Sequence, residues 1–212
     1  MSSIKLKHSG GNSVSLNPPT SAPTSSEVAF KLPTSDGSSG QVLQTDGSGN
    51  LSWASPGGIT VADQWRLTSD LAGTNPNDFI TSNLERVDTA PQGILGTGMS
   101  ESSGVFTFPS TGIYKVDFQF NVYSTSSQRY VGGRINATTD NSSYTILTDS
   151  SDGIYVPSTS SWGTGETSTL IDVTDTSNVK VKFGYYGIGS VTFKGSSTQN
   201  RTFMTFIRLG DT

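Results

Sequence analysis

Hydrophobic and polar residues alternate most regularly between Ser103 and Tyr123. From Tyr114 onward, apolar side chains take every second position, and polar or charged residues fill the positions between them. Successive side chains of a strand point to opposite faces, so this pattern predicts a β-strand with one buried face and one solvent face. A preceding alternation over 105–108 predicts a shorter strand, and Pro109–Gly112 predicts a tight turn between the two.

The remainder of the C-terminal part, from Ile59 onward, is denser in apolar and aromatic residues and contains no amphipathic helical run. We expect about ten short strands separated by turn signals, which is typical of an all-β sandwich or jelly roll. They lie near Asp63–Leu67, Phe79–Val87 with an interruption, Val105–Phe108, Ile113–Tyr123, Tyr130–Asn136, Tyr144–Leu147, Thr169–Val173, Val179–Tyr185, Val191–Lys194 and Thr202–Leu209. The last strand is apolar on both sides, which predicts a central position or a covering neighbour subunit.

The N-terminal part, residues 1–58, predicts an extended arm rather than a second core. Its short alternating segments are separated by a Pro-rich stretch at 17–26 and by Gly-rich turns, and 55–58 marks a boundary before the head at 59–212. Such isolated strands are marginal in water, so they are either disordered or paired with another surface. The apolar residues that we expect to dock on that surface are Ile4, Leu6, Val28, Phe30 and Leu32.

The amino-acid composition argues against several classes of function. The 212 residues are 32% hydrophobic and 14% charged, and the net charge is −4 with scattered Lys and Arg. A nucleic-acid binder carries a basic patch, and a membrane span needs a long apolar run; neither is visible, so we expect no nucleic-acid partner and no membrane insertion. There is no cysteine and one histidine, His8, and the N-terminus lacks the apolar core of a secretory signal.

Glycan hydrolysis is the enzymatic alternative, because it needs two carboxylates about 5–10 Å apart. The candidate acids are Asp149, Asp152, Glu166, Asp172 and Asp175. All of them lie among Ser, Thr and Gly in expected loops, which favours solvated turn carboxylates, so we expect no catalytic residue.

Two further kinds of motif are candidates for calcium or phosphate binding. The run 149–153, Asp-Ser-Ser-Asp-Gly, could suggest calcium but lacks the acidic density of a calcium loop. The Gly-rich runs 93–98 and 184–189 precede no helical pattern, so hairpin turns are expected rather than a phosphate cradle. We therefore expect no bound metal and no cofactor.

Aromatic residues near Gly/Ser-rich loops are the candidates for surface recognition. Exposed aromatic rings can stack on sugars or anchor an interface. The candidates are Trp162, Tyr186, Tyr185, Tyr155 and Tyr130. Packing across a subunit interface is the alternative, and it stays open for Trp162 and Tyr186.

The central stretch resembles the globular head of complement component one-q, which shares a jelly roll with tumour necrosis factor. That family has Phe, five residues, then Gly-x-Tyr-x-Phe-x-aromatic; here Phe106 is followed by Gly112, Tyr114, Val116 and Phe118. Val116 replaces the usual Phe, and Met99 stands where the family has an upstream Phe. The resemblance covers roughly Asp63 to Leu209 and implies a homotrimer of jelly rolls.

Other segments resemble phage appendage proteins. Residues 40–53, GQVLQTDGSGNLSW, are similar to segments that precede globular tips in phage fibres, and 63–67, 83–86 and 96–99 look like versions in marine and cyanobacterial phages. This resemblance implies a virion protein, assembled in a bacterial cytoplasm, whose partners are copies of itself and capsid or tail proteins. Tail fibre, capsid decoration, adhesion to host glycans and a carbohydrate-binding module stay open as roles.

Overall fold

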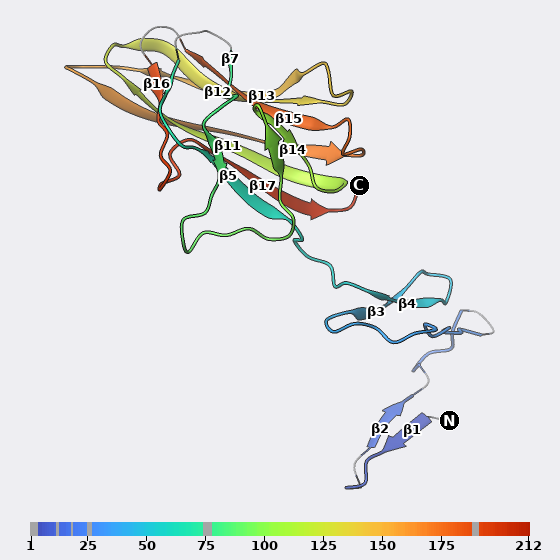
Figure 1. Cartoon of the computed structure of the whole chain (residues 1–212). Helices are drawn as coiled ribbons and strands as arrows, with labels where there is room; N and C mark the ends of the chain where they lie inside the picture. Colours follow the sequence, from blue (N-terminus) through green and yellow to red (C-terminus); the bar gives the residue numbers. More distant parts are fainter. Residues whose placement is uncertain (1–3, 12, 18, 25–26, 74–77, 188–190) are drawn as a thin grey trace. The chain divides into compact units, whose positions relative to one another are not determined.

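The computed structural model describes residues 4–11, 13–17, 19–24, 27–73, 78–187 and 191–212 (Figure 1). The contacts divide the chain into two compact units, Met1–Gly57 and Gly58–Thr212, here called unit 1 and unit 2. The described residues contain strands and no helix, hence none that is long and apolar enough to span a membrane. The strands are β1 (Ile4–Lys7), β2 (Ser13–Leu16), β3 (Val42–Thr45), β4 (Leu51–Ala54), β5 (Ala62–Leu67), β6 (Leu71–Ala72), β7 (Asp78–Phe79), β8 (Leu84–Arg86), β9 (Ser100–Ser102), β10 (Val105–Thr107), β11 (Gly112–Ser124), β12 (Gln128–Thr138), β13 (Thr145–Ile154), β14 (Ser161–Val173), β15 (Lys180–Gly187), β16 (Val191–Phe193) and β17 (Phe203–Gly210).

Unit 2 is a sandwich of two antiparallel sheets, which confirms the all-β fold expected from the sequence (Figure 1). In the first, here the β11 sheet, β14 pairs with one edge of β11, and β17 and β16 share its other edge; β5 and β8 follow β17, and β6 follows β16. The second, here the β12 sheet, runs β13-β12-β15-β10-β9, with β7 also on β15. Strands β13 and β14 are therefore edge strands, each paired with one neighbour among the described residues.

An aromatic cluster fills the space between the sheets. Phe106, Phe118, Phe183 and Phe206 come from four strands, and each is fully buried. The ring centroid of Phe183 lies 5.3 Å from that of Phe106 and 5.2 Å from that of Phe118. Burying a side chain of this size stabilises the fold by about 1.5–3 kcal/mol, and tilted or edge-on ring pairs add about 0.5–1.5 kcal/mol.

The strand-turn-strand prediction for 103–123 is confirmed by β10 and β11, with Tyr114, Phe118 and Phe120 in the core. Gly112 adopts φ 136°, and a Cβ there would lie 2.4 Å from the carbonyl oxygen of Gly210. Glycine is therefore needed where β11 begins beside the end of β17.

Strand β9 was not predicted, because Ser100–Ser102 has no apolar residue. It pairs with β10 through a two-residue turn in which Ser103 (φ 52°) and Gly104 (φ 79°) both have positive φ. Two such residues are typical of a tight hairpin turn that matches the twist of its strands.

Strands β13 and β14 are longer than the sequence predicts. We expected strands at 144–147 and 169–173, whereas pairing runs over Thr145–Ile154 and Ser161–Val173. The missed portions consist largely of Ser, Thr, Gly and Asp, because an edge strand with exposed side chains needs no hydrophobic alternation. Their conformation comes from backbone pairing with β12 and β11.

Strand β17 is central in the β11 sheet, between β11 and β5. Met204 and Phe206 point into the core and are fully buried, whereas Ile207 is half-buried on the outer face and Leu209 is 48% exposed. The sequence expected either a central strand or a strand covered by a neighbour subunit. The central position is confirmed, and the outer face remains open in the single chain.

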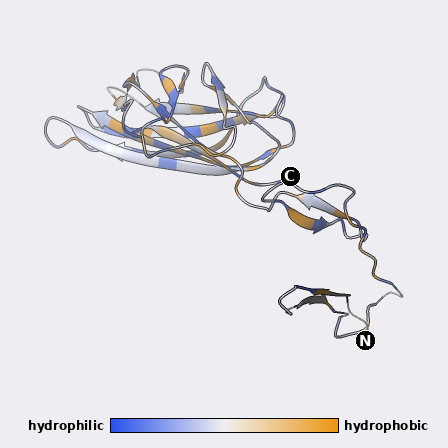
Figure 2. Cartoon of the chain, turned by 60° about the horizontal axis from the view of Figure 1, so that its bottom comes forward, coloured by the Kyte–Doolittle hydropathy of each residue, from blue (hydrophilic) through white to orange (hydrophobic). Residues whose placement is uncertain are grey.

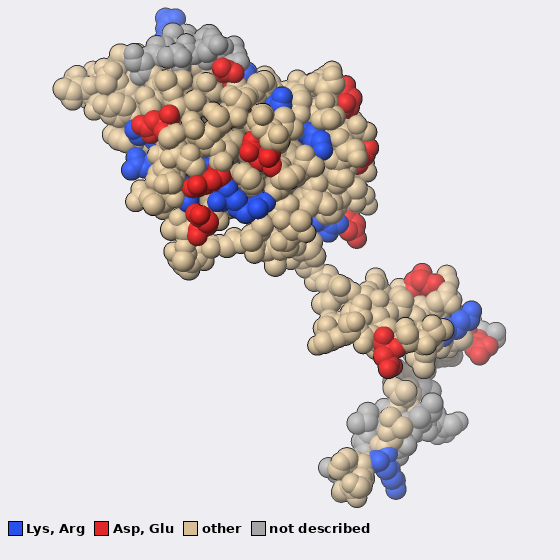
Figure 3. Space-filling model, in the orientation of Figure 1, with Lys and Arg blue, Asp and Glu red and all other residues tan. Residues whose placement is uncertain are grey.

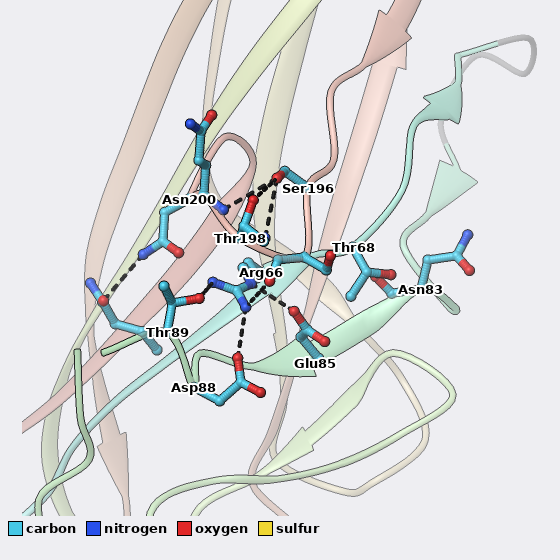
Figure 4. Close-up of polar contacts among 12 residues, drawn as sticks. Arg66, Thr68, Asn83, Glu85, Asp88, Thr89, Ser196, Thr198 and Asn200 are labelled. Atoms are coloured by element: carbon cyan, nitrogen blue, oxygen red, sulfur yellow. Dashed lines mark hydrogen bonds and ion pairs between the residues drawn. The ribbon is translucent and has the colours of Figure 1, made fainter. Parts of the chain in front are cut away.

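A buried arginine joins β5 and the edge strand β8 of the β11 sheet to two loops. The Arg66 side chain on β5 is fully buried, and its Nε donates to Glu85 Oε1 at 2.7 Å. Nη1 donates to Thr89 Oγ1 at 2.9 Å, and Nη2 donates to Asp88 Oδ1 at 2.8 Å and to the carbonyl oxygen of Ser197 (Figure 4). A buried charge is tolerable only when its donors are satisfied in this way.

Unit 1 consists of two small hairpins, β1–β2 and β3–β4. Lys31 joins the second hairpin: its N–H donates to the Gly49 carbonyl, and its own carbonyl accepts from the Leu51 N–H, each at 2.8 Å. The expected boundary near residue 58 lies beside the division between Gly57 and Gly58.

Candidate functional site

The outer face of the β11 sheet is apolar at one end. The pairing registers align Ile207 with Lys115 on one side and Ala62 on the other, and Lys115 with Leu170. Residues directly opposite in neighbouring strands share one face, so Ile207 and Leu170 lie in one row on either side of Lys115, with Leu170 61% exposed. Leu209, two residues beyond Ile207, adds a second exposed apolar side chain.

The middle of this face is polar and hollowed. A hollow of about 440 Å³ is lined by Lys115, Asp117, Phe118, Gln119, Glu166, Thr167, Ser168, Phe203 and Thr205. The Lys115 ammonium lies 2.8 Å from the Asp117 carboxylate. In the register of β11 with β14, Asp117 lies opposite Ser168 and Gln119 lies opposite Glu166. The carboxylates of Asp117 and Glu166 are therefore diagonal neighbours on one face.

At the other end of the same face, Tyr123 and Trp162 pack edge to face, with ring centroids 5.2 Å apart. Lys194 Nζ lies 5.6 Å and the Arg201 guanidinium carbon 5.9 Å from the Trp162 ring centroid. Lys194 also forms an ion pair with Asp70. The Trp162 side chain remains 53% exposed.

A second hollow, of about 310 Å³, lies between the edge strands β13 and β14; it is called the edge hollow below. Two of the predicted recognition residues line it, Trp162 and Tyr155, and Tyr155 is 76% exposed. Its remaining lining is Phe120, Val122, Val131, Ser150, Ser151, Asp152, Gly153, Ile154, Ser161, Gly163, Thr164 and Gly165. Exposed rings beside hydroxyls and one carboxylate are suited to a polyhydroxylated ligand.

Tyr130 and Tyr186 form a separate pair on the β12 sheet, with ring centroids 6.1 Å apart. The Tyr186 hydroxyl donates to Asp149 Oδ2 at 3.0 Å, so its orientation is fixed. Burial, followed by the nearby Asp149 carboxylate, raises the pKa of Tyr186 above its usual value. Neither residue lines the edge hollow, so the structure divides the predicted recognition residues into two groups.

The selection of Tyr185 as a surface recognition residue is wrong, although the strand predicted to end at this residue is confirmed. It lies in β15, is 4% exposed, and packs 5.1 Å, centroid to centroid, from Phe193. Its neighbour Tyr186 points to the other face of the sheet, because side chains alternate along a strand. Trp162 and Tyr186 lie in strands rather than loops, Tyr130 lies in a strand as predicted, and Tyr155 follows the end of β13.

The assignment of the candidate acids to loops is wrong for four of the five. Asp149 and Asp152 lie in β13, and Glu166 and Asp172 lie in β14. Residues three apart on a strand point to opposite faces, so the first pair does not converge on one substrate or ion. Glu166 and Asp172 share a face but are separated by about 20 Å along the strand.

Asp175 is the remaining candidate acid and lies in a turn. A hydrogen bond from the Ser177 backbone N–H is the main cause that lowers the pKa of Asp175, which is opposite to what a general acid needs. Across the described residues, no three His, Cys, Asp or Glu side chains gather in a way that could hold a metal ion. Of the Gly-rich run 184–189, residues 188 and 189 lie outside the described part.

The predicted docking residues of unit 1 are solvent-exposed in the single chain. Leu6, Val28, Phe30 and Leu32 are 67%, 56%, 64% and 73% exposed, respectively. Ile4 belongs to β1, and its side chain is not among those that the structure describes.

Comparison with known proteins identifies the fold. No protein-family model and no curated protein sequence matches the chain. Solved structures do: the TNF protein Eiger from S. frugiperda has a TM-score of 0.55 and 10% identity over 72% of this chain and 94% of its own. Murine APRIL has a TM-score of 0.51 and 11% identity over 70% of this chain and 98% of its own. Identity at this level shows the fold alone, and unit 2 is accordingly a jelly roll of the tumour-necrosis-factor type.

Proposed function

We propose that the chain is a non-enzymatic structural protein of a bacteriophage particle. In this proposal unit 2 forms a homotrimeric head, and unit 1 attaches that head to the capsid or tail. The observation that carries the proposal is the group of apolar side chains left open at one end of the outer face of the β11 sheet: Ile207 and Leu170, which flank Lys115, and the exposed Leu209 near the end of β17.

The physical argument concerns β17. The outer face of an antiparallel sheet in a monomeric sandwich is normally polar, but here a central strand places Ile207 on that face, and Leu209 is exposed near the end of the same strand. Each Å² of apolar surface removed from water contributes about 25 cal/mol, so self-association through this face is favourable. Lys and Arg are interspersed with Asp and Glu on the visible face, without a large field of one sign (Figure 3).

The phage assignment is supported by the sequence motifs at 40–53, 63–67, 83–86 and 96–99, and by a chain without cysteine. A jelly-roll head that follows an N-terminal arm in the sequence is compatible both with a tail fibre and with a capsid decoration. The test is immunogold labelling of purified particles with an antibody against unit 2. Label on tail or capsid is the expected result, and particles that lack both label and the protein by mass spectrometry would contradict it.

A second candidate function, carbohydrate binding by the head, is favoured by the edge hollow with its two exposed rings, Tyr155 and Trp162. We expect Trp162→Ala and Tyr155→Ala to weaken adsorption to host cells while the oligomer mass stays unchanged. Tyr130→Ala is the matched control, because Tyr130 is also exposed but does not line the hollow. Equal adsorption by all three variants and the parent protein would contradict carbohydrate binding at the edge hollow.

Glycan hydrolysis keeps one testable pair of carboxylates, Asp117 and Glu166, which line the hollow in the polar middle of the face. The non-enzymatic proposal expects no reducing ends from host polysaccharide incubated with the protein. Release that is lost in both Asp117→Asn and Glu166→Gln would establish the hydrolase instead.

A further inference from the structure

Residues 27–54 have an organised backbone. Strands β3 and β4 pair from Val42↔Ala54 to Thr45↔Leu51, and Lys31 adds a further bridge beside them at Asn50. The Trp53 indole Nε1 donates to the Ser35 carbonyl at 2.9 Å. Its ring also lies against Gly37, where a Cβ would come within 2.5 Å of a ring carbon. The segment is thus folded on itself rather than extended throughout.

The same segment lacks a core. No side chain that the structure describes in Met1–Gly57 is buried. All of its large apolar side chains except the partly buried Leu51 are exposed, by 39% to 73%: Val28, Phe30, Leu32, Val42, Leu43 and Trp53. Val42 and Leu43 are adjacent in β3, so both faces of the hairpin present apolar groups, coloured orange in Figure 2. A lone hairpin is marginal in water, so a further apolar surface is required.

The charge of unit 1 favours copies of the same segment as that surface. Unit 1 contains three Lys (5, 7 and 31) and three acids (Glu27, Asp36 and Asp46), so its formal net charge is zero. Copies therefore do not repel one another. A basic cluster that would direct the segment to nucleic acid or an anionic lipid surface is lacking in this sequence.

The covalent connection adds to this argument. Ala54 ends β4 and Ala62 begins β5, so the link spans about 26 Å at most when fully extended. Strand β5 belongs to the β11 sheet, the sheet whose outer face carries the proposed interface. If heads associate through that face, the attached segments are held at a high effective concentration, which converts a weak contact into a stable one.

We propose that residues 27–54 pack against the same residues of the other two copies and complete their apolar core between chains. Phe30, Leu32, Val42, Leu43 and Trp53 would supply this core. The inference rests on the proposed trimer and goes beyond it, because it assigns 27–54 to self-association and leaves the β1–β2 hairpin for attachment to the particle.

Trypsin tests the inference on the full chain. Lys31 is the one Lys or Arg between Lys7 and Arg66, so cleavage of this region reports on a single bond. We expect that bond to be protected in the parent protein and to be cut at least about 10-fold faster in a Phe30→Ser, Leu43→Ser double variant. The reason is that lowering the free energy of local opening by about 1.4 kcal/mol raises the population of the cleavable, open form tenfold. Ser48→Ala, at an exposed turn position of the same hairpin, is the control that should keep the protection.

Cysteine trapping supplies the second measurement, because the chain has no cysteine of its own. Leu43→Cys should form covalent dimers on mild oxidation with a yield independent of dilution, and Ser142→Cys in a unit 2 loop should not. A trimer mass combined with rapid cleavage after Lys31 and no cross-link at residue 43 would overturn the inference while leaving the trimer intact. A monomer mass would instead overturn the proposed trimer on which it rests.

Discussion

Arg66 and Glu85 face each other across β5 and β8, with Arg66 Nε donating to Glu85 Oε1 at 2.7 Å. The arginine side chain is fully buried, whereas the side chain of Glu85 is 32% exposed. Figure 4 shows the guanidinium among Glu85, Asp88 and Thr89, where it links three segments of the chain. The contact fixes the edge of the β11 sheet next to the face through which we propose that copies associate.

Replacing Arg66 should therefore destabilise unit 2 strongly. Arg66→Ala leaves Glu85 and the Ser197 carbonyl without their charged donor, and breaking a buried pair costs about 3–5 kcal/mol. Asp88→Ala should cost less than about 1 kcal/mol, because the Asp88 side chain is 78% exposed. Urea unfolding followed by circular dichroism measures both, and equal losses would contradict the role assigned to Arg66.

Sequence patterns predicted the parts of the fold that depend on burial. Alternation located β11 and β17, because their inward side chains, such as Phe118 and Phe206, enter the core. The extensions of β13 and β14 were missed, since Ser, Thr and Gly there are held by backbone pairing rather than by hydrophobic contacts. Met99, which stands where the resembling family has Phe, is fully buried in the core, so that substitution keeps the position apolar.

The candidate site was less predictable, because it depends on which strands become neighbours. Trp162 and Tyr155 were singled out as exposed aromatics, but the edge hollow between them requires the placement of β13 beside β14. The row of Ile207 and Leu170 likewise requires a three-strand register that no local pattern specifies. Tyr185 and Tyr186 show most plainly what the sequence pattern cannot predict. A shift of one residue in the strand register decides which of the two side chains enters the core.

A glycine in β14 provides a second stability prediction. A Cβ at Gly165 would lie 2.3 Å from Phe120 Cζ, so Gly165→Ala forces that buried ring to move, at a cost of about 1–3 kcal/mol. Gly93→Ala is the matched control, because no atom lies within 4 Å of its Cβ position. Thermal unfolding should show a lower Tm for Gly165→Ala alone, and a parent-like Tm would refute the packing described here.

The loop after β12 contains a carboxyl group whose ionisation can be measured directly. The Ser143 backbone N–H, the Thr138 hydroxyl and the Ser142 backbone N–H donate to Asp140 and lower its pKa to about 2. The folded value lies below the unfolded value of about 3.9. Its stabilising contribution is therefore present above pH ~3.9 and is lost as the pH falls through about 2.

NMR titration of the Asp140 carboxyl carbon tests this assignment. We expect a midpoint near 2 in the parent protein and a higher midpoint in Thr138→Val, which removes one donor. A parent midpoint near the ordinary value of about 3.9 would show that these hydrogen bonds do not persist in solution.

The proposed interface predicts which surface changes separate the copies. Leu170→Asp places a charge in the apolar row of the β11 sheet and should convert the trimer to monomer while unit 2 remains folded. Ile146→Asp is the matched control, because Ile146 is 54% exposed but lies in the β12 sheet. Sedimentation velocity distinguishes the two variants, and dissociation by Ile146→Asp alone would place the interface on the other sheet.

The mass of the full-length protein in solution tests the central claim most directly. Size-exclusion chromatography with multi-angle light scattering, at micromolar concentration, should give three times the 22.3 kDa of one chain. A mass of 22.3 kDa at the same concentration would contradict the account, because the apolar side chains of Ile207, Leu170 and Leu209 would then be open to solvent in the native protein.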